Sequence, residues 1–514
     1  MKLKNILYSL LLMTVLTFAS CNEATIDLVP IGDTDATFFQ NETQMTQAVL
    51  GIYQKVGFFY IFRNNQDLFL QSVWQLPSDD LTTQASHGME TFSGLTGQTG
   101  QLKDFYAFAY QLIARANVVL QKIEENGSFA YKLKPELKNY HKGEALFLRS
   151  WMNFILWNTY GTAPLINERI VNMDNAYPSN STGTQLLDQA ISDLATAITL
   201  LPATWDAANK GRVTASSARA LRGKALVFRG TVNKTQADFT SALTDFNAIA
   251  GASLMPNYED NFNYTKEYNA ESFFEYSANE AAGGTNNNAA LNNDGYAVVG
   301  DLSAWYGYFT QKPTWIGSTV YSATQSLIDS YEPGDPRMTY TLKANPKGTD
   351  LINVVKYTKD GMTTTGKAAN EQSKNNPRIL RYADVLLLKA EATVRTGGNL
   401  KDAITIINQI RDRARKSVVS GPASATPVDR NVNETNSTIV LNWVFQERRL
   451  ELACEEGHRW YDLRRRHIAG EMDLKTWNFN SKRIDFAFKD YNVNFPLPEI
   501  ETIDNKNLKQ NTGY

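Results

Sequence analysis

The sequence predicts a mostly α-helical fold in which helices pair into hairpins and two long turn-rich segments carry the ligand site. Apolar residues recur at the 3.6-residue spacing of amphipathic helices, and several such stretches come in adjacent pairs. Two segments, about 58–100 and 251–377, lack that spacing and are rich in Gly, Asn and aromatic residues. With 514 residues, 43% of them hydrophobic, the chain can bury a large core.

The N-terminal segment predicts export followed by lipid attachment. A basic start precedes an apolar run over residues 6–18, which is shorter than the roughly 20 residues of a membrane-spanning helix. Two small residues then precede Cys21, whose thiol is placed to accept a diacylglyceryl group. We expect a lipoprotein signal peptide over 1–20 and a lipidated tether over 21–37. The alternative is an ordinary secretory signal with an incidental cysteine.

Helical stripes follow in order along the chain. Apolar residues at helical spacing predict single helices over 102–123, 145–155 and 187–201. Two pairs come next, 218–228 with 239–249 and 383–396 with 403–414, each joined by a short polar turn. Pairs of this kind are typical of tetratricopeptide-type hairpins, and a stack of unrelated helical hairpins is the alternative.

Composition and motifs exclude several function classes. A formal net charge of −2 gives no electrostatic case for nucleic acid. The only cysteines are Cys21 and Cys454, so lipidation of the first leaves no intramolecular disulfide. The four histidines lack the spacing of a zinc helix, and neither a nucleophile elbow nor a phosphate loop is present. We therefore expect no catalytic residues, no cofactor and no metal site.

The turn-rich segments are where we expect the ligand. A sugar offers an apolar face and a rim of hydroxyls, so a glycan site needs flat aromatic rings edged by polar side chains. Residues 286–315 and the earlier segment around residue 74 hold that mixture. The alternative for each aromatic ring is that it fills a local core. For Asp79 and Asp80, the alternative is that they are turn residues. The candidate ligand-binding residues are Trp74, Asp79, Asp80, Asn288, Tyr296, Trp305, Tyr306, Tyr308 and Trp315.

Charged residues near the C-terminus alternate in sign at helical spacing. This pattern predicts a network of ion pairs that holds the last helix pair to the body, and the interleaved acids argue against a nucleic-acid patch. The residues in this prediction are Glu447, Arg448, Arg449, Glu451, Glu455, Glu456, Arg459, Asp462, Arg464, Arg465 and Arg466.

The C-terminal third contains motifs long enough to indicate a family. The stretches 381–392, 407–414, 447–453, 457–464 and 495–499 resemble the SusD/RagB family of outer-membrane lipoproteins of Bacteroidetes. The resemblance implies one SusD-like domain over 38–514, with tetratricopeptide-like units as scaffold. It also implies a surface-exposed, non-catalytic protein that binds oligosaccharide or polysaccharide and delivers it to a SusC-like TonB-dependent transporter. The alternative ligand is a peptide, as for RagB-like members, and a glycoside hydrolase is a distant third reading.

Overall fold

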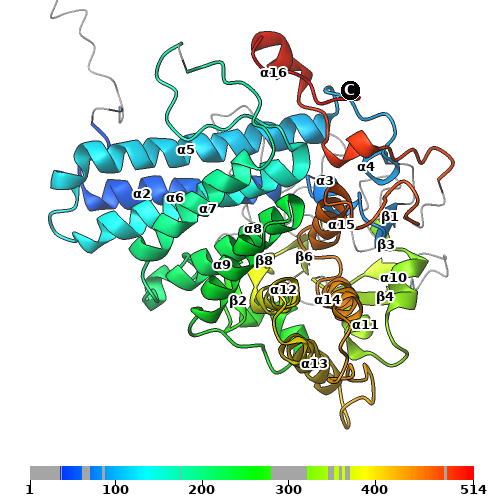
Figure 1. Cartoon of the computed structure of the whole chain (residues 1–514). Helices are drawn as coiled ribbons and strands as arrows, with labels where there is room; N and C mark the ends of the chain where they lie inside the picture. Colours follow the sequence, from blue (N-terminus) through cyan, green and yellow to red (C-terminus); the bar gives the residue numbers. More distant parts are fainter. Residues whose placement is uncertain are drawn as a thin grey trace, which may run out of the picture.

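The computed structural model describes residues 35, 37–60, 70–83, 87–173, 175–278, 321–344, 352–357, 362–364, 371–479 and 483–514. The fold is mostly helical, with 55% of the described residues in helices and a few short strands, as the spacing of apolar residues predicts (Figure 1). No helix within these ranges has the length and apolar character of a membrane span.

The N-terminal half is a layer of long helices that pack on one another in sequence order. Asn41 caps the first by accepting a hydrogen bond from the Gln44 amide, and Gly161, at φ +70°, ends the third. Each of the three predicted stripes matches one of these helices, and only the stripe 187–201 runs one residue past the end of its helix. The helices are α2 (Glu42–Val56), α5 (Gly100–Ala130), α6 (Glu136–Tyr160) and α7 (Gln185–Leu200).

The two predicted hairpins are present. Helix α8 (Ala215–Asn233) pairs with α9 (Gln236–Asn247), and α12 (Tyr382–Arg395) pairs with α13 (Leu400–Lys416). Gly223 explains the close approach within the first hairpin, because a Cβ there would lie 2.2 Å from the Phe246 ring. The chain then forms α14 (Ser437–Glu451), α15 (His458–Ile468) and α16 (Glu499–Asp504).

Short strands connect the two turn-rich segments. Strand β1 (Leu81–Thr83) pairs antiparallel with β3 (Tyr321–Ala323), which joins β5 (Ile352–Val354) and β4 (Leu342–Ala344) in the order β1-β3-β5-β4. Strand β2 (Ser272–Glu275) pairs antiparallel with β8 (Arg378–Arg381). Two further strands, β6 (Met362–Thr364) and β7 (Glu371–Ser373), pair with each other. Four short helices complete these regions: α3 (Ser72–Gln75), α4 (Gly88–Thr91), α10 (Gln325–Ser330) and α11 (Pro336–Thr341).

The predicted ion-pair network is confirmed and is almost fully buried. One series of ion pairs links α8, α12, α14 and α15. Asp384 of α12 binds Lys224 of α8 at 2.8 Å and Arg448 of α14 at 2.7 Å. Arg448 in turn binds Asp462 of α15 at 2.7 Å. A second group centres on Arg381, which contacts three carboxylates at 2.7–2.8 Å. These contacts hold α14 and α15 against the body.

Two members of the predicted network make no ion pair with another described residue. Glu456 accepts a hydrogen bond from the Tyr60 hydroxyl, and burial raises its pKa to about 8. Arg464 donates to the Val493 carbonyl and the Asn494 side chain, and its guanidinium lies 4.4 Å from the Trp157 ring. Glu456 lies in the turn between α14 and α15, and Arg464 lies on α15. Both side chains have uncharged partners, which the alternation of charges did not predict.

Candidate functional site

The structure corrects the prediction for Trp74. Its side chain is only 2% exposed and packs against the rings of Phe59, Tyr60 and Phe105. Gly457 also lies against it, since a Cβ there would be 2.7 Å from that of Trp74. Trp74 is therefore a core residue, because a ring enclosed in this way offers no face to a ligand.

The two neighbouring aspartates are also corrected. Asp79 receives a bidentate pair from Arg459, at 2.7 and 2.9 Å, and Asp80 pairs with Arg449 at 2.7 Å. Burial alone raises the pKa of Asp79, but Arg459 and Arg449 outweigh it and hold the pKa at about 2. These carboxylates extend the buried ion-pair network and are not acceptors for sugar hydroxyls. The other six candidates, Asn288, Tyr296, Trp305, Tyr306, Tyr308 and Trp315, lie outside the described residues.

A cleft lined by aromatic and polar side chains lies beside β2. It consists of two adjoining cavities of about 250 and about 630 Å³, which share the residues 210–212, 274 and 275. Its walls come from α2, from the turn between α7 and α8, from the turn before β2, and from β2 with the two residues that follow. We call it the β2 cleft. The side chains that concern its chemistry are Tyr53, Gln54, Trp205, Asn209, Lys210, Arg212, Tyr268, Asn269, Glu275, Tyr276 and Ser277.

Arg212 holds the wall of the cleft that contains Trp205. Its guanidinium binds both carboxylate oxygens of Glu144, at 2.7 and 2.5 Å, and lies 4.1 Å from the centre of the half-buried Trp205 ring. The Trp205 indole donates to the Val213 carbonyl at 2.9 Å, and the Tyr53 hydroxyl donates to Glu144 at 2.9 Å. Trp205 is thus held in one orientation before any ligand arrives.

Two tyrosines also line the cleft. The Tyr268 ring lies against Gly211, where φ is +96° and a Cβ would come within 2.6 Å of the ring, so only glycine fits. Its hydroxyl shares a hydrogen bond of 2.5 Å with Ser277. Tyr276 stacks on Tyr60 with 5.5 Å between ring centres. The exposed Lys210 reaches over Tyr268, with its amine 5.7 Å from the ring centre.

The carboxylates of the cleft are occupied by structural contacts. Glu275 accepts from the Tyr268 amide at 3.0 Å and from the Asn376 side chain at 2.8 Å. Burial raises the pKa of Glu144 even though Arg212 pairs with it, and burial raises the pKa of the nearby Glu267 to about 7. Each of these three acids thus already accepts hydrogen bonds from protein groups, and for Glu267 the donor is the Asn376 amide.

One group of potential metal ligands occurs in the described part of the chain. His467, Asp473 and Asp490 bring one ligand atom each within 4.8 Å of one another. The two aspartates are exposed, and Asp490 already pairs with Lys475 at 2.9 Å. We assign no metal to this group.

The β2 cleft combines aromatic rings with amide, hydroxyl, ammonium and guanidinium groups at their edges. Such a surface suits an uncharged ligand with apolar faces and many hydroxyls. Sequence reasoning missed it because its residues come from four separate segments and none carries a motif. The one available signal was Trp205 followed by Gly211 and Arg212 in a turn between two predicted helices.

Comparison with known proteins identifies the family. A family model described as "SusD family" matches residues 263–514, and one described as "Starch-binding associating with outer membrane" matches residues 35–225. A SusD-like protein of Bacteroides ovatus is 23% identical over 479 residues, which cover 88% of this chain and 80% of the relative.

Solved structures share the fold. A laminarin-binding SusD-like protein superposes with a TM-score of 0.69 at 23% identity, covering 92% of this chain and 100% of the other. The surface glycan-binding protein A of Bacteroides uniformis gives a TM-score of 0.68 at 19% identity, covering 92% and 99%. This chain therefore belongs to the SusD/RagB family of non-catalytic, outer-membrane-associated binding proteins, as a SusD-like member.

Proposed function

We propose that this protein is a lipid-anchored, surface-exposed outer-membrane protein that binds glycan oligosaccharides and delivers them to a partner TonB-dependent transporter. The observation that carries the proposal is the β2 cleft, where oriented aromatic rings alternate with polar side chains. The description of the matched starch-binding family, and the glycan ligands named for two structural relatives, support the same ligand class.

The energetics favour an oligomer over a single sugar. Stacking one sugar ring hides about 50 Å² of apolar surface and contributes about 1 kcal/mol before entropy costs. Several rings are therefore needed for useful affinity. In the sequence, the aromatic stretch 296–315 follows the cleft residues Tyr276 and Ser277. We include Asn288, Tyr296, Trp305, Tyr306, Tyr308 and Trp315 in the proposal as further sugar contacts.

Binding assays with cleft variants test this proposal. Trp205→Ala and Tyr268→Ala should each weaken binding of the preferred oligosaccharide by about 5- to 150-fold, which corresponds to about 1–3 kcal/mol. Trp443→Ala is the matched control, because that half-buried tryptophan lies on α14 and outside the cleft. Isothermal titration calorimetry with laminari-, malto- and other defined oligosaccharides provides the affinities, and melting temperatures show that the fold is kept.

Two results would overturn the glycan assignment. The first is tight binding of unstructured peptides with no binding of any oligosaccharide, which would favour the peptide alternative. The second is steady release of reducing ends that scales with protein concentration, which would indicate a hydrolase. Normal oligosaccharide binding by both cleft variants would instead move the site away from the β2 cleft.

The transporter partner is tested separately. A tethered binder cannot itself move a ligand across the membrane, so extraction in mild detergent should co-purify a large TonB-dependent β-barrel. Recovery of the binding protein alone, under conditions that preserve comparable membrane complexes, would contradict delivery to such a transporter.

A further inference from the structure

The described chain enters the fold beside one surface loop. The Asp35 carboxylate pairs with Lys122 of α5 at 3.1 Å and with Arg169 at 3.2 Å, and the Phe39 carbonyl accepts from the Asn126 side chain at 3.2 Å. Arg169 belongs to the loop between α6 and α7, residues 161–184. The tether proposed above therefore reaches the body next to this loop.

The same loop exposes large apolar side chains. Ile170 and Val171 follow Arg169 directly, and together with Met173 and Tyr177 they are 43–67% exposed. Side chains of this size usually lie inside a folded protein, and a group of them on one surface marks an interaction site more often than a single exposed one does.

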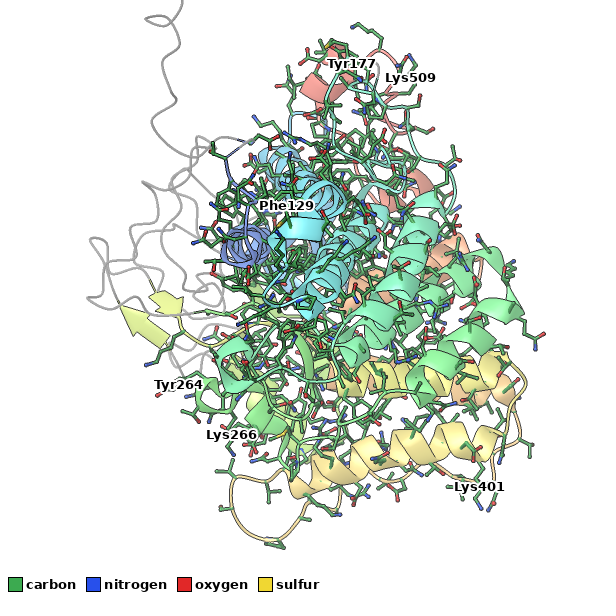
Figure 2. All side chains as sticks on the ribbon, turned by 90° about the vertical axis from the view of Figure 1, so that its left-hand side faces the viewer. Phe129, Tyr177, Tyr264, Lys266, Lys401 and Lys509 are labelled. Carbon is green, nitrogen blue, oxygen red and sulfur yellow. The ribbon has the colours of Figure 1, made fainter. Side chains whose placement is uncertain are left out.

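Helix α16, whose following segment contacts the Tyr177 end of this loop, exposes two further apolar side chains. Its Ile500 and Ile503 are 52% and 51% exposed. The segment after α16 is hydrogen-bonded to the loop. The Asn505 side chain donates to the Pro178 carbonyl at 2.6 Å, and the Asn507 side chain donates to the Tyr177 carbonyl at 2.8 Å. Figure 1 shows the loop and α16 at the upper end of the molecule, and Figure 2 shows Tyr177 beside Lys509 at that end.

We propose that these six residues, Ile170, Val171, Met173, Tyr177, Ile500 and Ile503, form the surface that docks on the membrane-embedded transporter. We call them the tether-side patch. The proposal rests on the proposed function, because the lipid on Cys21 sets the position of the body. Asp35 lies 14 positions after Cys21, and an extended chain of that length spans at most about 50 Å. The loop part of the patch, which Arg169 joins to Asp35, can thus meet a membrane-embedded partner without straining the tether.

Charge favours a protein over the lipid surface as the occupant. Surfaces that bind anionic lipid headgroups combine apolar side chains with clusters of Lys and Arg. Here the apolar residues of α16 alternate with acids, Glu499, Glu501 and Asp504, and the basic residues nearby, Arg169, Lys506 and Lys509, do not outnumber them. A surface without an excess of basic residues gains no electrostatic attraction to anionic headgroups, whereas a protein partner can offer apolar side chains to match it.

Site-specific photo-crosslinking in intact cells tests the patch. The full-length protein would carry benzoylphenylalanine at Val171 or Ile503 and, as control, at Val419, an apolar residue that is 72% exposed on the loop after α13. We expect a crosslink from the two patch positions to a β-barrel transporter, identified by mass spectrometry, and none from Val419.

A charge-insertion variant provides a second readout. The double substitution Val171→Glu with Met173→Glu should reduce the co-purifying transporter by about tenfold or more, while melting temperature and oligosaccharide affinity stay unchanged. Val419→Glu with Val428→Glu is the matched control and should leave the complex intact.

The outcomes separate the two proposals. If the wild-type protein co-purifies with a transporter but the patch positions give no crosslink, or crosslink only to lipid or to a second copy, the patch is refuted and the proposed function stands. If the glutamate pair leaves the complex intact, the patch is likewise refuted. If the wild-type protein recovers no transporter at all, delivery to that partner fails, and the patch fails with it.

Discussion

Replacing Arg381 with methionine tests how strongly the buried ion pairs stabilise the fold. Arg381 makes five hydrogen bonds of 2.7–2.9 Å, four to the carboxylates of Glu271, Glu451 and Glu455 and one to the Glu451 carbonyl. All four side chains are fully buried. Methionine fills similar space but leaves three carboxylates with less positive charge.

The magnitude follows from the contacts that remain. Removing one partner of a buried ion pair costs about 3–5 kcal/mol, because the other charge stays buried without compensation. Arg413 still contacts Glu271 and Glu451, and Lys356 still contacts Glu455 at 2.8 Å. We therefore expect the lower end of that range for Arg381→Met, about 3 kcal/mol of the free energy of unfolding.

An exposed ion pair of the same kind provides the control. Lys416 pairs with Asp412 at 2.6 Å, but their side chains are 64% and 44% exposed. Because water screens such a pair, Lys416→Met should cost less than about 1 kcal/mol. Chemical denaturation followed by far-UV circular dichroism measures both variants.

The loss should also depend on pH. Burial alone would raise the pKa of Glu451, but Arg413, Arg381 and Arg337 hold it at about 2, below its ordinary value of 4.5. A carboxylate with a lowered pKa stabilises the fold above pH 4.5, and that contribution disappears as the pH falls from 4.5 toward 2. The gap between wild type and Arg381→Met should thus be largest at neutral pH and shrink below pH 4.5. Two results would refute this explanation. One is an equal loss of unfolding free energy in Arg381→Met and Lys416→Met, and the other is a difference between wild type and Arg381→Met that grows as the pH falls.

Three further predictions concern single residues. Trp74→Ala should lower the free energy of unfolding by about 3–5 kcal/mol, as a core aromatic does, and leave the oligosaccharide affinity of the folded fraction unchanged in calorimetry; a selective loss of affinity would return Trp74 to the ligand site. Cys21→Ala should release the protein from the membrane fraction with no change in helicity or melting temperature, and retention after a salt wash would exclude the lipid as its anchor. Glu456→Gln should make the free energy of unfolding less dependent on pH. Burial raises the pKa of Glu456 from 4.5 to about 8, so its contribution to stability is lost as the pH rises through that range. If wild type and Glu456→Gln show the same pH dependence of stability between pH 5 and 8, Glu456 is ionised in the folded protein.

The sequence alone determined the helical scaffold and indicated that the charges of the C-terminal helices form ion pairs. The helices could be predicted because residues three or four apart lie on one face of a helix. The stripe at 102–123 lies within α5, and the pairs at 218–249 and 383–414 became the hairpins α8–α9 and α12–α13. The alternating charges of α14 and α15 predicted ion pairs but not their partners. Arg448, for example, pairs with Asp384, which lies 64 residues away in the sequence, and Arg459 pairs with Asp79, which lies 380 residues away.

Only the tertiary structure decided which aromatic rings are buried and which line a cleft. Trp74 and Trp205 both occur in turn-rich sequence with polar neighbours, so nothing local separates them. Phe105 and Gly457 enclose Trp74. Arg212, in contrast, holds Trp205 half-exposed at a wall of the β2 cleft. Asp79 and Asp80 likewise meet Arg459 and Arg449 only after 370 residues or so of chain have folded back on them. Burial depends on contacts between distant segments, and one sequence read locally does not contain them.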